Sequence, residues 1–126
     1  MAAHVLVVED SALVVGALQV LLEDAGHRVS CAPTVREAIA CARRDPPDVL
    51  LLDLTLPDGD GLTVIEALAA GGAPPPVTAA MTGHDEPAVR ERCLRAGCRA
   101  VLIKPIAPLT LPRQIAEWLG GRKSKE

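Results

Sequence analysis

Short apolar runs alternate along this chain of 126 residues with longer segments in which apolar residues recur every three or four positions. The short runs are typical of buried strands, and the longer segments have the period of amphipathic helices. Strands are expected at 5–8, 28–32, 49–52, 77–81 and 100–103. Helices are expected at 11–26, 34–46, about 62–69, 85–96 and about 109–119. The alternation predicts a parallel sheet covered by helices.

Local signals mark several boundaries of these elements. Thr34 and Glu37 have the spacing of a capping box at a helix start. Gly26 is at the end of the first predicted helix and Gly97 follows the fourth, positions where glycine commonly ends a helix. Three consecutive prolines, 74–76, are interpreted as a turn, since one short proline run inside a strand and helix pattern usually joins elements. The last residues, 120–126, are interpreted as a polar tail or the start of a linker.

The composition indicates a folded protein, because 49% of the residues are hydrophobic and 23% are charged, and a length of 126 residues indicates one domain. The net charge of -3 predicts no general attraction to nucleic acid or to anionic membranes. Four arginines, Arg90, Arg92, Arg95 and Arg99, are interpreted as a solvated helix face. The chain shows no export signal and no apolar stretch long enough for a bilayer, so a cytoplasmic location is expected.

The core has an unusual composition. Phe and Tyr are absent, and Trp118 is the only aromatic residue, so the core is expected to consist of Val, Leu, Ile and Ala. The four cysteines, Cys31, Cys41, Cys93 and Cys98, form no CxxC pair. They are expected to be reduced and to act as small core residues.

Five residues with chemically active side chains follow the predicted strands: Glu9, Asp10, Asp53, Thr82 and Lys104. The carboxyl ends of parallel strands meet at one edge of a sheet, which is where open α/β sheets bind ligands. We therefore expect three carboxylates, a hydroxyl and an ammonium group to share one pocket.

These groups suit a phosphoryl site that contains a metal ion. No glycine-rich loop follows the first strand, so neither a P-loop nor a dinucleotide site is predicted. Clustered carboxylates favour a hard divalent cation, and Mg²⁺ bound by Glu9, Asp10 and Asp53 is the hypothesis. Asp53 would be the nucleophile that forms an aspartyl phosphate. Lys104 and the Thr82 hydroxyl would then contact phosphoryl oxygens.

Five segments in order, VLVVED, LLLDLTLPDGDGL, MTG (81–83), AG (96–97) and KP (104–105), resemble the receiver domain of bacterial two-component response regulators. The resemblance implies a flavodoxin-like (βα)5 three-layer sandwich over residues 1–119, with a five-stranded parallel sheet in the order 2-1-3-4-5. It also implies phosphoryl transfer from a histidine kinase or phosphotransfer protein to Asp53, followed by self-dephosphorylation. Such a domain is a phosphoacceptor and not a classical turnover enzyme.

The resemblance assigns further roles. It implies that the Thr55 backbone carbonyl is a metal ligand and that Lys104-Pro105 has a cis peptide bond. Thr55 and His84 would flank the water that attacks the acyl phosphate and would set its lifetime. An output protein would contact the face made by the fourth helix, fifth strand and fifth helix.

One position departs from the family pattern. Receivers carry an aromatic residue three positions before the lysine, and it turns inward behind the switch threonine, here Thr82; this chain has Val101 there. We expect the structural change on phosphorylation to be muted or rerouted.

Other functions are less consistent with the residues. A phosphatase of the haloacid dehalogenase type needs a second acid where Thr55 stands. Residues 58–61 resemble the start of a calcium loop, but the remaining ligand positions are wrong. A docking module that works without phosphorylation stays open as the alternative, although it has no physical need for three carboxylates together.

Overall fold

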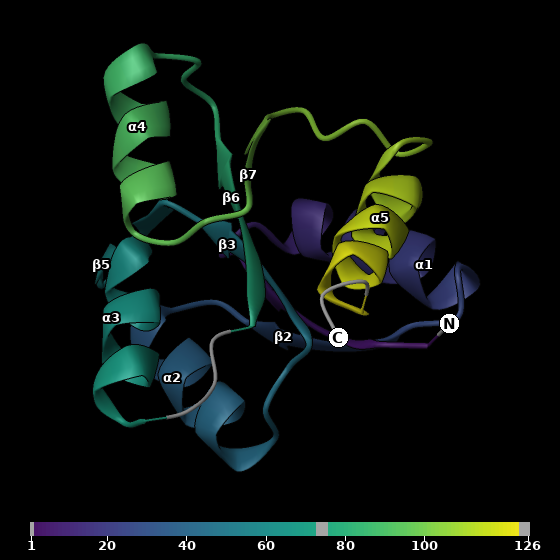
Figure 1. The fold of residues 1–126 in the computed structure, drawn as a ribbon, viewed down its shortest axis with the longest axis horizontal. Helices are drawn as coiled ribbons and strands as arrows, with labels where there is room; N and C mark the ends of the chain where they lie inside the picture. The colour runs from purple at the N-terminus through teal and green to yellow at the C-terminus, as the bar shows by residue number, and fades with distance from the viewer. Residues whose placement is uncertain (1, 73–75, 124–126) are drawn as a thin grey trace.

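The computed structural model describes residues 2–72 and 76–123, and over that part of the chain it contains a five-stranded sheet with all strands parallel (Figure 1). The sheet order is β2-β1-β3-β6-β7. Its strands are β1 (His4–Val8), β2 (Arg28–Ala32), β3 (Val49–Asp53), β6 (Val77–Thr82) and β7 (Ala100–Ile103). The helices are α1 (Ala12–Asp24), α2 (Val35–Arg44), α3 (Leu62–Ala70), α4 (Pro87–Arg95) and α5 (Leu111–Lys123). This is the predicted flavodoxin-like α/β fold, and the predicted order of its five main strands is confirmed.

Two apolar layers hold the sheet between its helices. One layer joins the sheet to α2, α3 and α4, and the other joins it to α1 and α5, as Figure 1 shows. Every residue of β1 and of β3 is buried, which explains why both strands are almost continuously apolar in sequence. Most of the buried core side chains are aliphatic, as expected, and Trp118, Met81, Cys93 and Cys98 are buried with them.

Predicted capping signals form at both ends of helices. The Ser11 side chain accepts a hydrogen bond from the Val14 N–H (3.4 Å), and that of Thr34 accepts one from the Glu37 N–H (3.1 Å). At the end of α4, Gly97 has a φ of 108°, a left-handed conformation that glycine adopts without strain.

The cysteines are free and lie in or beside the core. Cys93 and Cys98 are buried, whereas Cys31 and Cys41 are half-buried. Burial raises the pKa of the Cys98 thiol to about 12, so this side chain is protonated and unreactive at neutral pH.

Two predicted regions differ from the structure. The loop expected after β3 contains a short antiparallel hairpin of β4 (Thr55–Leu56) and β5 (Gly59–Asp60). Helix α5 spans Leu111–Lys123 instead of about 109–119. The expected end was wrong because glycine costs a helix only about 1 kcal/mol, so Gly120 and Gly121 do not end it. Residues 120–123 of the expected tail therefore belong to α5, while residues 124–126, like Pro74 and Pro75 of the proline run, lie outside the described residues.

The arginines of α4 are paired. Arg90, Arg92 and Arg95 form ion pairs with Asp85, Asp60 and Glu91, respectively. The interpretation as a solvated helix face fits this pairing. Between residues 2 and 72 and between 76 and 123, no helix is both long enough and apolar enough to cross a bilayer.

Candidate phosphoryl site

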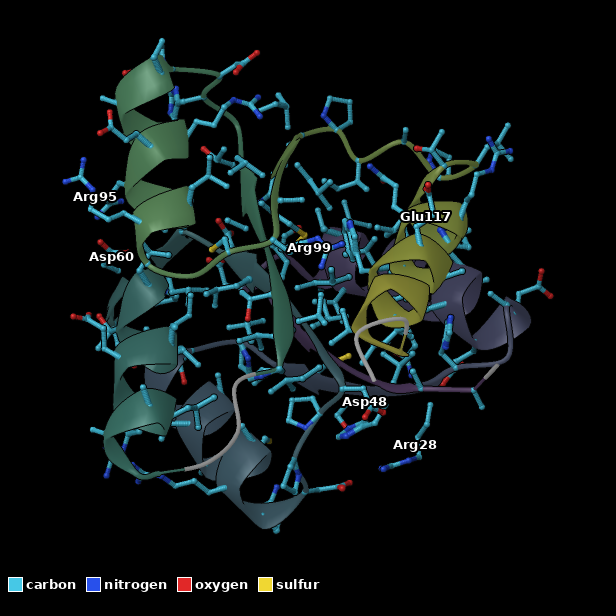
Figure 2. The ribbon with its side chains drawn as sticks, in the orientation of Figure 1. Arg28, Asp48, Asp60, Arg95, Arg99 and Glu117 are labelled. Carbon is cyan, nitrogen blue, oxygen red and sulfur yellow. The ribbon has the colours of Figure 1, made fainter. Side chains whose placement is uncertain are left out.

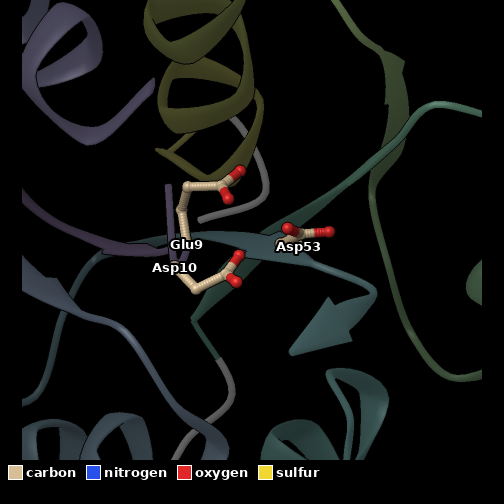
Figure 3. Close-up of side chains that lie close together, drawn as sticks. All are labelled: Glu9, Asp10 and Asp53. Carbon is tan, nitrogen blue, oxygen red and sulfur yellow. The ribbon is translucent and has the colours of Figure 1, made fainter. Parts of the chain in front are cut away.

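The carboxyl edge of the sheet brings the predicted acidic residues together. Glu9 and Asp10 follow β1, and Asp53 is the last residue of the neighbouring strand β3. One carboxylate oxygen from each of the three lies within 4.8 Å of the others. Figure 3 shows the three carboxylates grouped at this edge. Their burial differs, because Glu9 and Asp53 are buried while Asp10 is exposed to solvent.

Lys104 links two of these acids from the end of β7. Its Nζ donates to Glu9 Oε1 at 2.6 Å and to Asp53 Oδ2 at 3.1 Å. Burial lowers the pKa of Lys104, but the hydrogen bonds to the two carboxylates outweigh burial and raise that pKa overall. The ammonium group therefore stays charged beside Asp53.

Backbone N–H groups hold the remaining oxygens of the same two acids. Glu9 Oε2 accepts from the Ser11 N–H at 3.0 Å, and Asp53 Oδ1 accepts from the Thr55 N–H at 3.2 Å. Each carboxylate is thus oriented from two directions, by the backbone N–H two residues further along and by the distant Lys104 ammonium.

Thr82 lies at the end of β6, the strand beside β3. It is buried, its hydroxyl oxygen accepts from the His84 N–H at 3.1 Å, and its carbonyl accepts from the Lys104 N–H at 2.8 Å. Thr82 is therefore hydrogen-bonded through its backbone to Lys104, the residue that follows β7.

The other residues assigned by resemblance are placed as follows. The Lys104-Pro105 peptide bond is cis, as expected. Thr55 and His84 are exposed at the loops that follow Asp53 and Thr82, and their effect on the acyl phosphate lifetime stays a prediction. Val101 is half-buried on β7 and packs against the core layer of α2, α3 and α4.

The residues present fit a divalent metal ion. Three carboxylates within 4.8 Å of one another carry more negative charge than the single ammonium of Lys104 can neutralise. All three offer the oxygen ligands that Mg²⁺ prefers. Glu9, Asp10 and Asp53 can therefore hold such an ion, and the Thr55 carbonyl stays a predicted fourth ligand.

The sequence analysis did not identify three structural residues, two in the hairpin that follows Asp53 and one directly after it. The Asp58 carboxylate accepts from the Val35 N–H at 2.8 Å and the Arg36 N–H at 3.1 Å, which lowers the pKa of Asp58 and caps α2. Asp60 accepts from the Leu62 N–H at 3.0 Å at the start of α3. A Cβ on Gly61 would lie 2.0 Å from the Asp53 carbonyl oxygen. The two carboxylates of residues 58–61 thus accept hydrogen bonds from backbone N–H groups at the starts of α2 and α3. In the sequence, the only signal for this role is that Asp is common at such positions.

The model of the response regulator receiver domain family matches residues 5–116. The chain belongs to this family. As a receiver domain it is a component of two-component signalling, and its general role is that of a phosphoacceptor.

Relatives of this receiver domain include an uncharacterized 14.6 kDa protein from the sodA1 3′ region of Leptolyngbya boryana, 32% identical over 117 residues that cover 90% of this chain and 88% of the relative. The transcriptional regulatory protein PhoP of Escherichia coli K12 is 36% identical over 102 residues, which are 81% of this chain and 45% of that protein. This chain therefore spans less than half of the PhoP length.

Solved receiver structures share the fold. The signal receiver domain of a putative Luxo repressor protein from Vibrio parahaemolyticus superposes with a TM-score of 0.90 at 26% identity, covering 99% of this chain and 95% of that one. The chemotaxis protein CheY4 of Vibrio cholerae gives a TM-score of 0.84 at 26% identity, covering 93% and 98%.

Proposed function

We propose that Asp53 of this receiver domain accepts a phosphoryl group from the phosphohistidine of a kinase or phosphotransfer protein. An Asp53 oxygen attacks the phosphorus, the bond from phosphorus to the imidazole nitrogen breaks, and the histidine leaves. The contact of the Lys104 ammonium with the Asp53 carboxylate carries this proposal, because it places a fixed positive charge where the phosphoryl oxygens would gather.

Each site residue has a part in this transfer. Lys104 lies 3.1 Å from Asp53 Oδ2, so a small shift would bring its ammonium onto a phosphoryl oxygen. The Thr82 hydroxyl would donate to another. Mg²⁺, held by Glu9, Asp10, Asp53 and the Thr55 carbonyl, would supply further neutralisation of the phosphoryl charge. Hydrolysis of the acyl phosphate by water, with Thr55 and His84 alongside, would reset the domain.

A small-molecule phosphodonor tests this proposal directly. With Mg²⁺ present, the intact protein should gain the mass of one phosphoryl group, and Asp53→Asn should gain none because an amide is not a nucleophile of this kind. Asp24→Asn, an exposed acid at the end of α1, should be labelled as the unchanged protein is. Mass spectrometry of the intact proteins gives the answer. No labelling of the unchanged protein would favour a docking module that works without phosphorylation.

The histidine protein is proposed to contact an apolar hollow of about 490 Å³ beside the pocket. Lys104 lines this hollow, so a partner that places its histidine near Asp53 would cover it. Leu13, at its α1 side, is 87% exposed and adds to the apolar lining that a partner could cover. The output protein is proposed to read the face of α4, β7 and α5.

The donor is a phosphorylated histidine kinase that labels the unchanged protein. Leu13→Asp should make transfer from this kinase about tenfold slower, which is equivalent to about 1.4 kcal/mol of lost contact free energy. Labelling by a small phosphodonor should not change. Val20→Asp is the control, because Val20 is 70% exposed on the same helix and does not line the hollow. Equal slowing by both substitutions would show that the hollow is not the contact.

A further inference from the structure

The hairpin of β4 and β5 is a short connection between the phosphoacceptor Asp53 and the start of α3. It begins at Thr55, whose N–H donates to the Asp53 carboxylate, and ends at Asp60, next to Gly61. Gly61 is buried against the Asp53 backbone, since its Cβ would lie only 2.0 Å from the Asp53 carbonyl oxygen and 3.2 Å from the Leu54 Cα. The first residue of the hairpin and the residue directly after it therefore both lie against Asp53, where close packing leaves little room for separate movement.

Asp60 connects this hairpin to α4. One of its carboxylate oxygens accepts from the Leu62 N–H at 3.0 Å, and the other accepts from Arg92 Nη1 at 2.5 Å. Figure 2 places Asp60 where α3 and α4 approach each other. Arg92 lies on α4, 32 residues further along the chain, so this contact joins β5, just before α3, to α4.

A hollow of about 400 Å³ lies between the hairpin and α4. Thr55 and Thr82 line one part of it, and Val89 and Arg92 of α4 line another. Packing between the hairpin and this part of α4 is therefore incomplete, and the Asp60–Arg92 ion pair, although its side chains are 41% and 52% exposed, is a direct contact between the two.

We propose that the Asp60–Arg92 ion pair couples phosphorylation of Asp53 to α4 in this chain, in place of the missing aromatic residue at Val101. This inference rests on the proposed function. A phosphoryl group on Asp53 changes the contacts that its two oxygens now make with the Thr55 N–H and with Lys104. The hairpin shifts when these contacts change, and the close packing of Gly61 against the Asp53 backbone keeps the end of the hairpin in place relative to β3. Through its ion pair, Asp60 then displaces Arg92 and the middle of α4. Arg92 is thus a positioning residue for the signalling face.

The test uses the whole chain with beryllium trifluoride as the phosphoryl mimic and Mg²⁺, followed by NMR of the backbone amides. In the unchanged protein, signals of 53–61 and of 87–95 should both shift. In Arg92→Gln, the shifts of 87–95 should fall to less than about half, whereas those at Asp53 and Thr55 should persist. Arg92→Lys keeps the charge and should restore much of the α4 response.

Arg95→Gln is the matched control. Arg95 pairs with Glu91 of its own helix and projects away from the molecule in Figure 2, so its loss should leave the α4 response intact. The inference is overturned if Arg92→Gln leaves the α4 shifts unchanged, if Arg95→Gln reduces them equally, or if the largest shifts surround Val101. If the mimic produces no shift at Asp53 in the unchanged protein, the proposed function itself fails.

Discussion

Gly61→Ala should lower the free energy of unfolding by about 2–3 kcal/mol, the scale of a substitution that overpacks a rigid interior. The added Cβ would meet the Asp53 carbonyl oxygen at 2.0 Å, and the neighbouring atoms are backbone, which cannot rotate away as a side chain does. Conformation is not the cause, because Gly61 has an ordinary helical φ of -57°. The overlap must therefore displace either β3 or the start of α3. Urea denaturation followed by far-ultraviolet circular dichroism measures the loss.

Gly16→Ala provides the opposite case. Gly16 is exposed within α1, and a Cβ there would meet nothing within 4 Å, so alanine should stabilise the protein by about 0.5–1 kcal/mol. Unchanged stability of Gly61→Ala would contradict the packing described for Gly61, and a loss of stability in Gly16→Ala would contradict the open surroundings of Gly16. Where the overlap displaces β3, the Gly61 variant should also accept a phosphoryl group more slowly, because Asp53 moves with its backbone.

Lys104→Met should reduce the rate of labelling by a small phosphodonor by about 100- to 1000-fold, the effect of removing one charge-stabilising group from a transition state. Methionine keeps much of the apolar stem but leaves Glu9 and Asp53 without their shared ammonium partner. The same change should increase the affinity for Mg²⁺, because a cation then enters a cluster of three carboxylates with no ammonium competing for their oxygens.

A lower labelling rate together with a higher Mg²⁺ affinity would distinguish a local effect of Lys104→Met from damage to the fold. Mg²⁺ affinity comes from titration followed by calorimetry, and the labelling rate comes from mass spectrometry over time. Lys104→Arg should retain part of the rate, since it keeps the charge with a different geometry. A variant that loses both Mg²⁺ affinity and labelling would indicate that Lys104 supports the fold and not the phosphoryl group.

The sequence predicted the sheet and most of the pocket because both depend on local rules. Uninterrupted apolar runs identify strands that are buried on both faces, and the residue after each run must then lie at the shared carboxyl edge. Glu9, Asp10 and Asp53 therefore meet, although 43 residues separate Asp10 from Asp53. The contacts of Lys104 with Glu9 and Asp53 follow from the same geometry.

Features that depend on the packing of separate elements were not predicted. The capping of α2 by Asp58 and the pairing of Asp60 with Arg92 join residues 22 to 32 positions apart, and no periodicity in the sequence records them. The steric role of Gly61 is also invisible in sequence, because a glycine in a turn usually indicates backbone freedom. The continuation of α5 past Gly120 has a simpler cause, since helix propensity is a weak signal beside the packing of buried residues such as Ile115 and Trp118.

The aliphatic core has a practical consequence for spectroscopy. Trp118 is the only aromatic side chain, is 7% exposed, and packs in the layer between the sheet and α1 and α5. All intrinsic fluorescence of the protein therefore originates from one indole in that layer. Emission spectra report on one face of the sheet, and the absence of tyrosine leaves no background signal to subtract.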